Sequence, residues 1–159
     1  MNWLASIILA ASLALLPDIG LAASRLLSEH EWLRIRQIAA NCSLTDEQTW
    51  LLAAIRRLEN GRPGLEFGVG GPMDSGHPAH RHQDGYRSYY VQGAWSAGTI
   101  LAHYRGNLKA FGRRYCPPRA AFWSSKIAKI IEQLKSENNG QLPGFRPAKA
   151  PWPFRDLKN

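Results

Sequence analysis

The sequence lacks the signature motifs of several large enzyme classes. It contains no nucleophile elbow, no phosphate-binding P-loop and no dinucleotide-binding glycine fingerprint, and no internal repeat is visible. Acidic residues are also scarce, because 12 Asp and Glu stand against 20 Lys and Arg and leave a formal net charge of +8. Such a charge attracts polyanions, whether nucleic acid, a membrane surface or an anionic cell wall, and does not choose among them.

The N-terminus lacks both the positive charge of a typical signal peptide and the length of a membrane span. No Lys or Arg precedes Leu4, and the apolar run Leu4 to Leu16 is shorter than the roughly 20 residues that cross a bilayer. Small residues follow at positions 20–24. We interpret residues 1–24 as a secretory signal peptide, which predicts a periplasmic or extracellular protein. An uncleaved inner-membrane anchor is the alternative, and it would be the only contact with a membrane. Export argues against nucleic acid as the partner.

Cysteine is almost absent as well. An even pair, Cys42 and Cys116, reads as one disulfide in an oxidising compartment. Such a bond stabilises by about 2–4 kcal/mol when it is unstrained. Two independent thiols are the alternative.

The remaining composition is that of one globular domain with appendages. Apolar residues make up 45% of the 159 residues and charged residues 20%, and six Trp, five Tyr and five Phe supply core surface. We expect the domain to span residues 25–135 and a proline-rich arm to span residues 136–159. The expected protein is a monomer.

Two sequence patterns mark helix starts. Ser28 with Glu31, and Thr45 with Gln48, each have the form of a capping box. Apolar residues then recur at helical spacing, and the second helix is expected to stop at Asn60 and Gly61. A glycine- and proline-rich stretch over residues 61–88 follows, with room for one short strand or hairpin at 65–69.

Two further helical patterns follow this stretch. From about Tyr89 an apolar face is expected, whose members are Val91, Ala94, Trp95, Gly98, Leu101 and Ala102. The last helix has an apolar stripe made of Trp123, Ile127, Ile130, Ile131 and Leu134. The prediction is a mainly α fold of four or five helices, with a glycine-rich loop or hairpin after the second.

Glu59 is the best candidate for a catalytic acid. It ends the second helix beside apolar neighbours and opens onto the glycine-rich stretch. Burial and the negative end of a helix dipole both raise a carboxyl pKa. A raised pKa suits a general acid that protonates a glycosidic oxygen. A solvated surface carboxylate is the plainer interpretation.

The segments 52–61 (LAAIRRLENG), 64–69 (GLEFGV) and 92–101 (QGAWSAGTIL) resemble small phage and bacterial proteins of the lysozyme-like, lytic-transglycosylase-like group. Residues 114–117 (RYCP), followed by Trp123, are similar to the closing segment of that group. The resemblance covers residues 46–131. It implies an α+β lysozyme-like fold and cleavage of the MurNAc–GlcNAc linkage of peptidoglycan, with Glu59 as the acid.

The resemblance also implies a sugar cleft beside Glu59. Phe67, Gly68 and Val69 would form one wall, with Tyr90 or Gln92 reaching it. The spacing of aromatic and basic residues adds Tyr86 and Tyr89 as residues that stack on sugar rings, whereas Trp95 is expected in the core.

A hydrolase needs a second carboxylate. The candidates are Glu66, Asp74 and Asp84, and Glu66 has a structural alternative in which it binds backbone N–H groups of the glycine-rich turn. Without a second carboxylate, a one-acid lytic transglycosylase fits better. A non-catalytic wall-binding or envelope-assembly protein on the same fold is the competing interpretation.

The loop that carries His77, His80 and His82 has a spacing compatible with a metal site. Pro78 restricts its backbone and no cysteine lies nearby, so a solvated loop is preferred. No metal or cofactor is expected.

Overall fold

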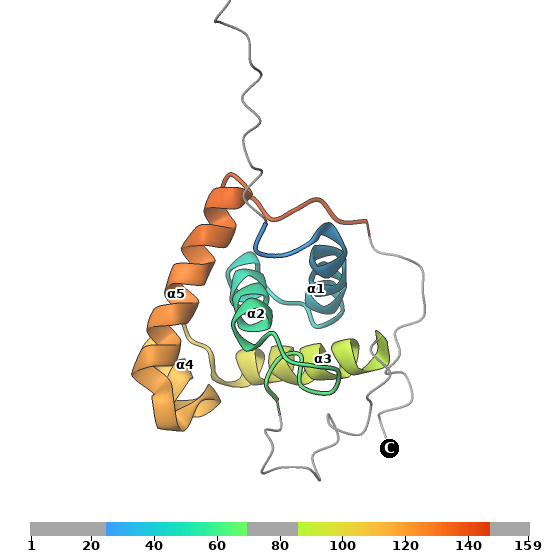
Figure 1. Cartoon of the computed structure of the whole chain (residues 1–159). Helices are drawn as coiled ribbons and strands as arrows, with labels where there is room; N and C mark the ends of the chain where they lie inside the picture. Colours follow the sequence, from blue (N-terminus) through green and yellow to red (C-terminus); the bar gives the residue numbers. More distant parts are fainter. Residues whose placement is uncertain (1–24, 70–85, 147–159) are drawn as a thin grey trace, which may run out of the picture.

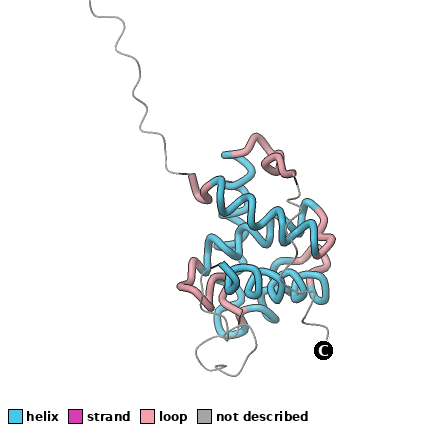
Figure 2. Tube along the Cα trace, turned by 90° about the vertical axis from the view of Figure 1, so that its right-hand side faces the viewer, coloured by secondary structure: helices cyan, strands magenta, loops and turns pink. Residues whose placement is uncertain are grey.

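The computed structural model describes residues 25–69 and 86–146, and this part of the chain is mainly helical (Figures 1 and 2). The elements are α1 (Glu29–Asn41), α2 (Asp46–Glu59), α3 (Tyr86–His103), α4 (Leu108–Tyr115), the short 3₁₀ helix η2 (Pro117–Arg119) and α5 (Ala120–Glu137). The mainly α prediction is therefore confirmed. The predicted signal peptide, the histidine-rich loop and the end of the predicted arm lie outside the described residues.

The two predicted capping boxes are present. Ser28 and Thr45 each accept a hydrogen bond from a backbone N–H in the first helical turn, and the third residue of the helix bonds back to the cap. At the other end of α2, Asn60 adopts the left-handed conformation (φ 39°, ψ 37°) that turns the chain out of the helix. Both starts and the α2 stop were thus readable from local side-chain chemistry.

Helix α2 is the centre of the fold. It lies between α1 and α5, and α3 crosses beneath α1 and α2 (Figure 1). Every residue from Trp50 to Ile55 is at most 5% exposed, so this part of α2 is covered on all sides. Its position makes α2 the shared surface on which the other helices bury their apolar faces.

The strand predicted at residues 65–69 is wrong, and the described residues contain no strand (Figure 2). The segment folds into consecutive turns, in which Leu65 N–H donates to Arg62 O (2.9 Å) and Gly68 N–H donates to Leu65 O (3.0 Å). Positive φ angles at Gly64 (90°) and Gly68 (68°) are incompatible with an extended strand.

The predicted buried face of α3 is also wrong. Trp95 and Leu101 are 44% and 41% exposed, whereas the polar residues Ser88, Gln92 and Ser96 are fully buried. Polar side chains enter a core when hydrogen bonds satisfy them, and these residues bond to the glycine-rich turn and to α4. Apolar periodicity alone therefore selected the wrong face, and α3 begins earlier than predicted, at Tyr86.

The predicted disulfide is not formed, and both cysteines are free thiols. Cys42 caps α1 and Cys116 caps α4, and these two helices do not contact each other. The two thiols are separate, half-buried residues that pack against the core. Burial raises the pKa of the Cys42 thiol.

The chain after α5 begins as an arm that lies along the domain. Helix α5 continues to Glu137, two residues beyond the predicted boundary, and the next residues pass over the end of α2 toward α1 (Figure 1). Leu142 packs against the core, and the Arg36 guanidinium lies 5.9 Å from the Phe145 ring centre. No described helix is both long enough and apolar enough to cross a membrane.

Two glycines of α3 provide a matched test of the packing. A Cβ at Gly93 would lie 2.3 Å from Ile38 Cδ1 and 3.3 Å from the Phe67 ring, whereas a Cβ at Gly98 would meet nothing within 4 Å. We expect Gly93→Ala to lower the free energy of unfolding by about 1–3 kcal/mol. Gly98→Ala should raise it by about 0.5–1 kcal/mol, because alanine is the better helix former.

Urea unfolding monitored by circular dichroism measures both effects. Equal effects of the two substitutions would contradict the close crossing of α1 and α3 at Gly93.

Candidate functional site

The candidate site is built where α2 ends. Glu59 is the last residue of α2, and Asn60 turns the chain directly into the glycine-rich turn, which we define as residues 61–69. A Cβ at Gly61 would lie 2.0 Å from Leu65 O. The turn therefore closes on itself too tightly for any other residue at position 61, and its far end returns toward the Glu59 side chain.

The Glu59 carboxylate is held on two sides. The Trp123 indole N–H, from α5, donates to Glu59 Oε1 (3.0 Å). Gly68 lies against the same carboxylate, because a Cβ there would be 2.7 Å from Glu59 Oε2. Among the described residues Oε2 accepts no hydrogen bond, so one oxygen is bound to the protein and the other is available for proton transfer.

Burial raises the pKa of Glu59, and the hydrogen bond from Trp123 lowers it by a smaller amount. Desolvation disfavours the ionised form, whereas a donor aimed at the carboxylate favours it. The net result is a carboxyl group that keeps its proton to a higher pH than an ordinary glutamate. This is the direction that the sequence predicted for a general acid.

The half-buried side chain of Tyr115 supports Trp123. The Tyr115 ring stacks on Trp123 (ring centres 5.1 Å apart), and its hydroxyl donates to Phe67 O (2.6 Å). Ser96 of α3 shares a hydrogen bond with the same hydroxyl (3.0 Å). Tyr115 thereby connects α3, α4, α5 and the glycine-rich turn, and it ties the donor of Glu59 to the backbone beside Gly68.

Glu66 occupies a separate buried position. It is 4% exposed and accepts hydrogen bonds from Gly64 N–H (3.0 Å) and from the Ser88 hydroxyl. This is the kind of backbone contact that the sequence analysis offered as its structural alternative. Both carboxylate oxygens are committed to the protein, so Glu66 does not present a second carboxylate to a ligand. Asp74 and Asp84 lie outside the described residues.

Gln92 clamps the turn to α3. Its amide nitrogen donates to Gly64 O (2.9 Å) and Val69 O (2.8 Å), and its amide oxygen accepts from Val69 N–H (3.1 Å). The side chain is fully buried. The prediction that Gln92 reaches a sugar cleft is therefore wrong for this buried side chain. Its place is behind the turn that faces Glu59.

Other predicted substrate-binding residues are also buried. Phe67 is 0% exposed and packs edge-on against Tyr89, which is 3% exposed, and Tyr90 is 7% exposed. Their side chains belong to the core, where the Arg34 and Arg56 guanidinium groups lie over the Tyr89 ring. The prediction that these three side chains contact a sugar is therefore wrong, because they are buried in the core.

Gly68 is the residue of the predicted cleft wall that lies against Glu59, and Gly68 is exposed. Val69 is half-buried. The side chain of Tyr86 lies outside the described residues, although the residue begins α3.

Sequence reasoning did not assign Trp123 and Tyr115 to the site. Trp123 was expected only as a core residue of the last helix, and Tyr115 only as part of a closing segment. The hydrogen bond to Glu59 spans 64 positions of sequence. No local pattern indicates such a pairing, and the resemblance gave these residues only as part of a closing segment.

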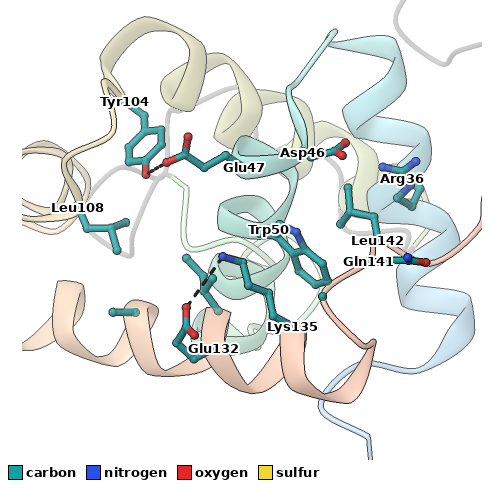
Figure 3. A pocket seen from close by; sticks show the side chains of 13 residues that line it. Arg36, Asp46, Glu47, Trp50, Tyr104, Leu108, Glu132, Lys135, Gln141 and Leu142 are labelled. Atoms are coloured by element: carbon teal, nitrogen blue, oxygen red, sulfur yellow. Dashed lines mark hydrogen bonds and ion pairs between the residues drawn. The ribbon is translucent and has the colours of Figure 1, made fainter.

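A large pocket lies at the opposite end of α2 (Figure 3). It has a volume of about 760 Å³, and its walls include Asp46 and Glu47 of α2, Trp50, and Glu132 and Lys135 of α5. Glu47 accepts a hydrogen bond from the Tyr104 hydroxyl (2.6 Å). Burial, together with this carboxylate, raises the pKa of Tyr104 to about 12. Asp46 and Glu47 also stabilise the start of the helix. The pocket does not include Glu59.

No cluster of potential metal ligands occurs within the described ranges 25–69 and 86–146. The three histidines of the predicted loop lie outside those ranges.

No protein-family model, curated protein or solved structure matches this chain.

The raised pKa of Glu59 predicts a pH-dependent cost of its charge. Below the ordinary glutamate pKa, Glu59 is protonated in both the folded and the unfolded state, so its charge costs no stability. As pH rises through the ordinary and then the raised pKa, the unfolded state loses its proton first and stability falls. We expect Glu59→Gln to be more stable than wild type at pH 7 and equally stable at pH values below both pKa values.

Urea unfolding across this pH range measures the difference between the two proteins. A variant that is less stable than wild type at neutral pH would contradict the assigned direction of the pKa shift.

The Trp123 hydrogen bond makes a second, independent prediction. Trp123→Phe removes the N–H donor that favours the ionised carboxylate, so the pKa of Glu59 should rise further. Carbon-13 NMR titration of the side-chain carboxyl measures this pKa directly. Trp95→Phe is the matched control because Trp95 is 44% exposed, and it should leave the Glu59 titration unchanged. A fall in the Glu59 pKa of Trp123→Phe would contradict the hydrogen bond.

Proposed function

We propose that this chain is a lysozyme-like, peptidoglycan-cleaving enzyme in which Glu59 is the single catalytic acid and base. The observation that carries the proposal is the state of the Glu59 carboxyl. It is desolvated, held through Oε1 by Trp123 and bounded by the backbone of Gly68. A fixed, partly buried carboxylic acid beside an exposed glycine turn is the arrangement that general-acid catalysis requires.

The proposed fold is the α+β lysozyme-like fold that the resemblance implies. The order of the parts supports this proposal, since an acid ends a central helix, a tight turn follows it and a further helix packs behind the turn. The sequence resemblance over residues 46–131 supplies the substrate class, which is the MurNAc–GlcNAc linkage.

The commitment of Glu66 favours a lytic transglycosylase over a hydrolase. A retaining hydrolase places two carboxylates about 5 Å apart, and an inverting hydrolase places them about 6.5–9.5 Å apart. Glu66 is bonded to Gly64 and Ser88 inside the fold. Glu59 is therefore the only one of these two carboxyl groups with an oxygen available to a substrate.

The reaction then needs no second carboxylate and no water. Glu59 Oε2 donates its proton to the glycosidic oxygen as the bond from that oxygen to C1 of the MurNAc ring breaks. The 6-hydroxyl oxygen of the same ring bonds to C1, and the ionised Glu59 accepts the hydroxyl proton. The products are a 1,6-anhydro sugar and a free 4-hydroxyl on GlcNAc, and Glu59 returns to its protonated state.

The Trp123 hydrogen bond assigns the two oxygens of Glu59 different tasks. A carboxyl oxygen that accepts an N–H bond is the poorer site for the proton, so the proton resides on Oε2. The acid thus acts through one oxygen while the other fixes its orientation.

A digest of purified peptidoglycan with product analysis by mass spectrometry tests the proposal. Wild-type protein should release 1,6-anhydro muropeptides, and Glu59→Gln should lose at least about a hundredfold in rate, because general acid–base catalysis contributes about 10²–10⁴-fold. Glu132→Gln is the matched control, since this glutamate has an exposed side chain on α5, and it should retain full activity.

Reducing-end products that depend on Glu59 would replace the transglycosylase with a hydrolase. If well-folded wild-type protein releases no product, the proposed enzyme activity is contradicted. Co-sedimentation with the same peptidoglycan would then test the competing role as a wall-binding protein.

A further inference from the structure

The charge of the protein is concentrated in one continuous part of the chain. No acidic residue occurs between Asp84 and Glu132, so every charged residue in that interval is Lys or Arg. The described acidic residues belong to α1, α2, the glycine-rich turn and the second half of α5. The excess positive charge behind the net charge of +8 therefore lies in the part of the chain that contains α3, α4 and the start of α5.

The most basic part of this interval is the bend between α4 and α5, which we call the basic elbow and define as residues 113–126. Arg113, Arg114, Arg119 and Lys126 are all exposed there. No described acidic side chain forms an ion pair with any of them, since the ion pairs of the described residues involve Arg25, Arg56 and Lys135. These charges therefore face solvent without neutralising partners among residues 25–69 and 86–146.

The tip of the basic elbow is apolar. Pro117 and Pro118 are exposed, and Phe122 is 59% exposed, the most exposed large apolar side chain of the described residues. The Lys126 ammonium lies 5.4 Å from the centre of the Phe122 ring. An exposed aromatic ring beside a cation, in a basic segment, is typical of a surface that enters the boundary between lipid headgroups and acyl chains.

The basic elbow is also rigid. The Ser124 hydroxyl bonds to Leu108 O (2.9 Å) and to Ala120 O (2.7 Å), and Gly112 allows α4 to approach Ser124 so closely that a Cβ there would lie 2.3 Å from its hydroxyl oxygen. Trp123, next to Phe122, is 3% exposed and anchors the first turn of α5 in the core. A preformed surface loses little conformational entropy when it binds.

We propose that the basic elbow is a docking surface for anionic lipid membranes, in which Phe122 enters the interface and the exposed Arg and Lys side chains of the elbow bind lipid phosphates. This goes beyond the sequence-based expectation that an N-terminal segment is the only membrane contact, and it does not depend on the proposed enzyme activity. The exposed ring favours a membrane over a soluble polyanion, because a polymer in water offers no apolar phase for Phe122.

The geometry connects this surface with the candidate site. Phe122 and Trp123 are consecutive residues of α5 and lie about 100° apart around the helix axis. Phe122 is exposed to solvent, whereas Trp123 is buried and bonds to Glu59. Docking through the basic elbow therefore fixes the orientation of the Glu59 site relative to the lipid surface.

Co-sedimentation of the full-length protein with vesicles tests the proposal. The protein should bind mixed phosphatidylglycerol–phosphatidylcholine vesicles more tightly than pure phosphatidylcholine vesicles. Arg113→Gln/Arg119→Gln/Lys126→Gln should weaken binding to the anionic vesicles by roughly a hundredfold, because each basic residue near an anionic surface contributes a several-fold gain. Phe122→Ser should weaken it by about tenfold through loss of the buried ring.

Matched variants elsewhere on the protein control for net charge and apolar surface. Arg25→Gln/Lys135→Gln/Arg146→Gln removes the same charge outside the basic elbow, and Leu33→Ser removes a side chain that is 50% exposed on α1. Both controls should bind as wild type does. These comparisons are made on the full chain, so any contribution of residues 1–24 is common to all variants.

The proposal is overturned if the two triple variants lose the same affinity, since binding would then follow net charge alone. It is also overturned if Phe122→Ser binds the anionic vesicles as tightly as wild type. Binding to soluble heparin that needs the elbow charges, with no preference for anionic vesicles, would replace the membrane with a soluble polyanion. Peptidoglycan cleavage is not measured in any arm, so failure here and failure of the enzyme proposal remain distinguishable.

Discussion

The arrangement around Glu59 depends on the buried amide of Gln92. Three hydrogen bonds from this single side chain hold the glycine-rich turn against α3, at Gly64 and at its last residue, Val69. An amide without these partners would not be stable at full burial. The turn in turn determines where Gly68 lies, and Gly68 bounds the carboxylate at the end of α2. The site is thus supported from behind by a polar contact that a purely apolar core would lack.

Local chemistry made the helix boundaries predictable. Ser28, Thr45 and Asn60 act on backbone groups within a few residues of themselves, so their roles can be read from short stretches of sequence. The stripe of α5 was also readable, since Trp123, Ile127 and Leu134 are all buried. The turn at residues 65–69 was not predictable in this way. Its glycines indicated only a loop, whereas their positive φ angles determine the path of the chain.

The errors share a physical cause. The polar residues Ser88, Gln92 and Ser96 were not among the predicted core residues, whereas Trp95 was assigned to the core because it lies on the apolar face. Whether a polar side chain can be buried depends on partners that are distant in sequence, such as Glu66 and Tyr115. The same limitation hid the contact of Trp123 with Glu59. Residue type sets the cost of burial, whereas the partners that offset it are set by the tertiary fold.

The two buried polar anchors of the turn also bear on how such a chain can diverge. Gln92 holds Val69, and Glu66 holds Ser88, so the residues that flank positions 70–85 are secured by bonds to α3 and to the turn themselves. The entropic cost of a connecting segment grows only with the logarithm of its length. Insertions or deletions between these anchors would therefore leave the acid and its supports in register. In evolutionary terms, the interval is a place where segments can be exchanged while Glu59 and the residues that hold it keep their arrangement.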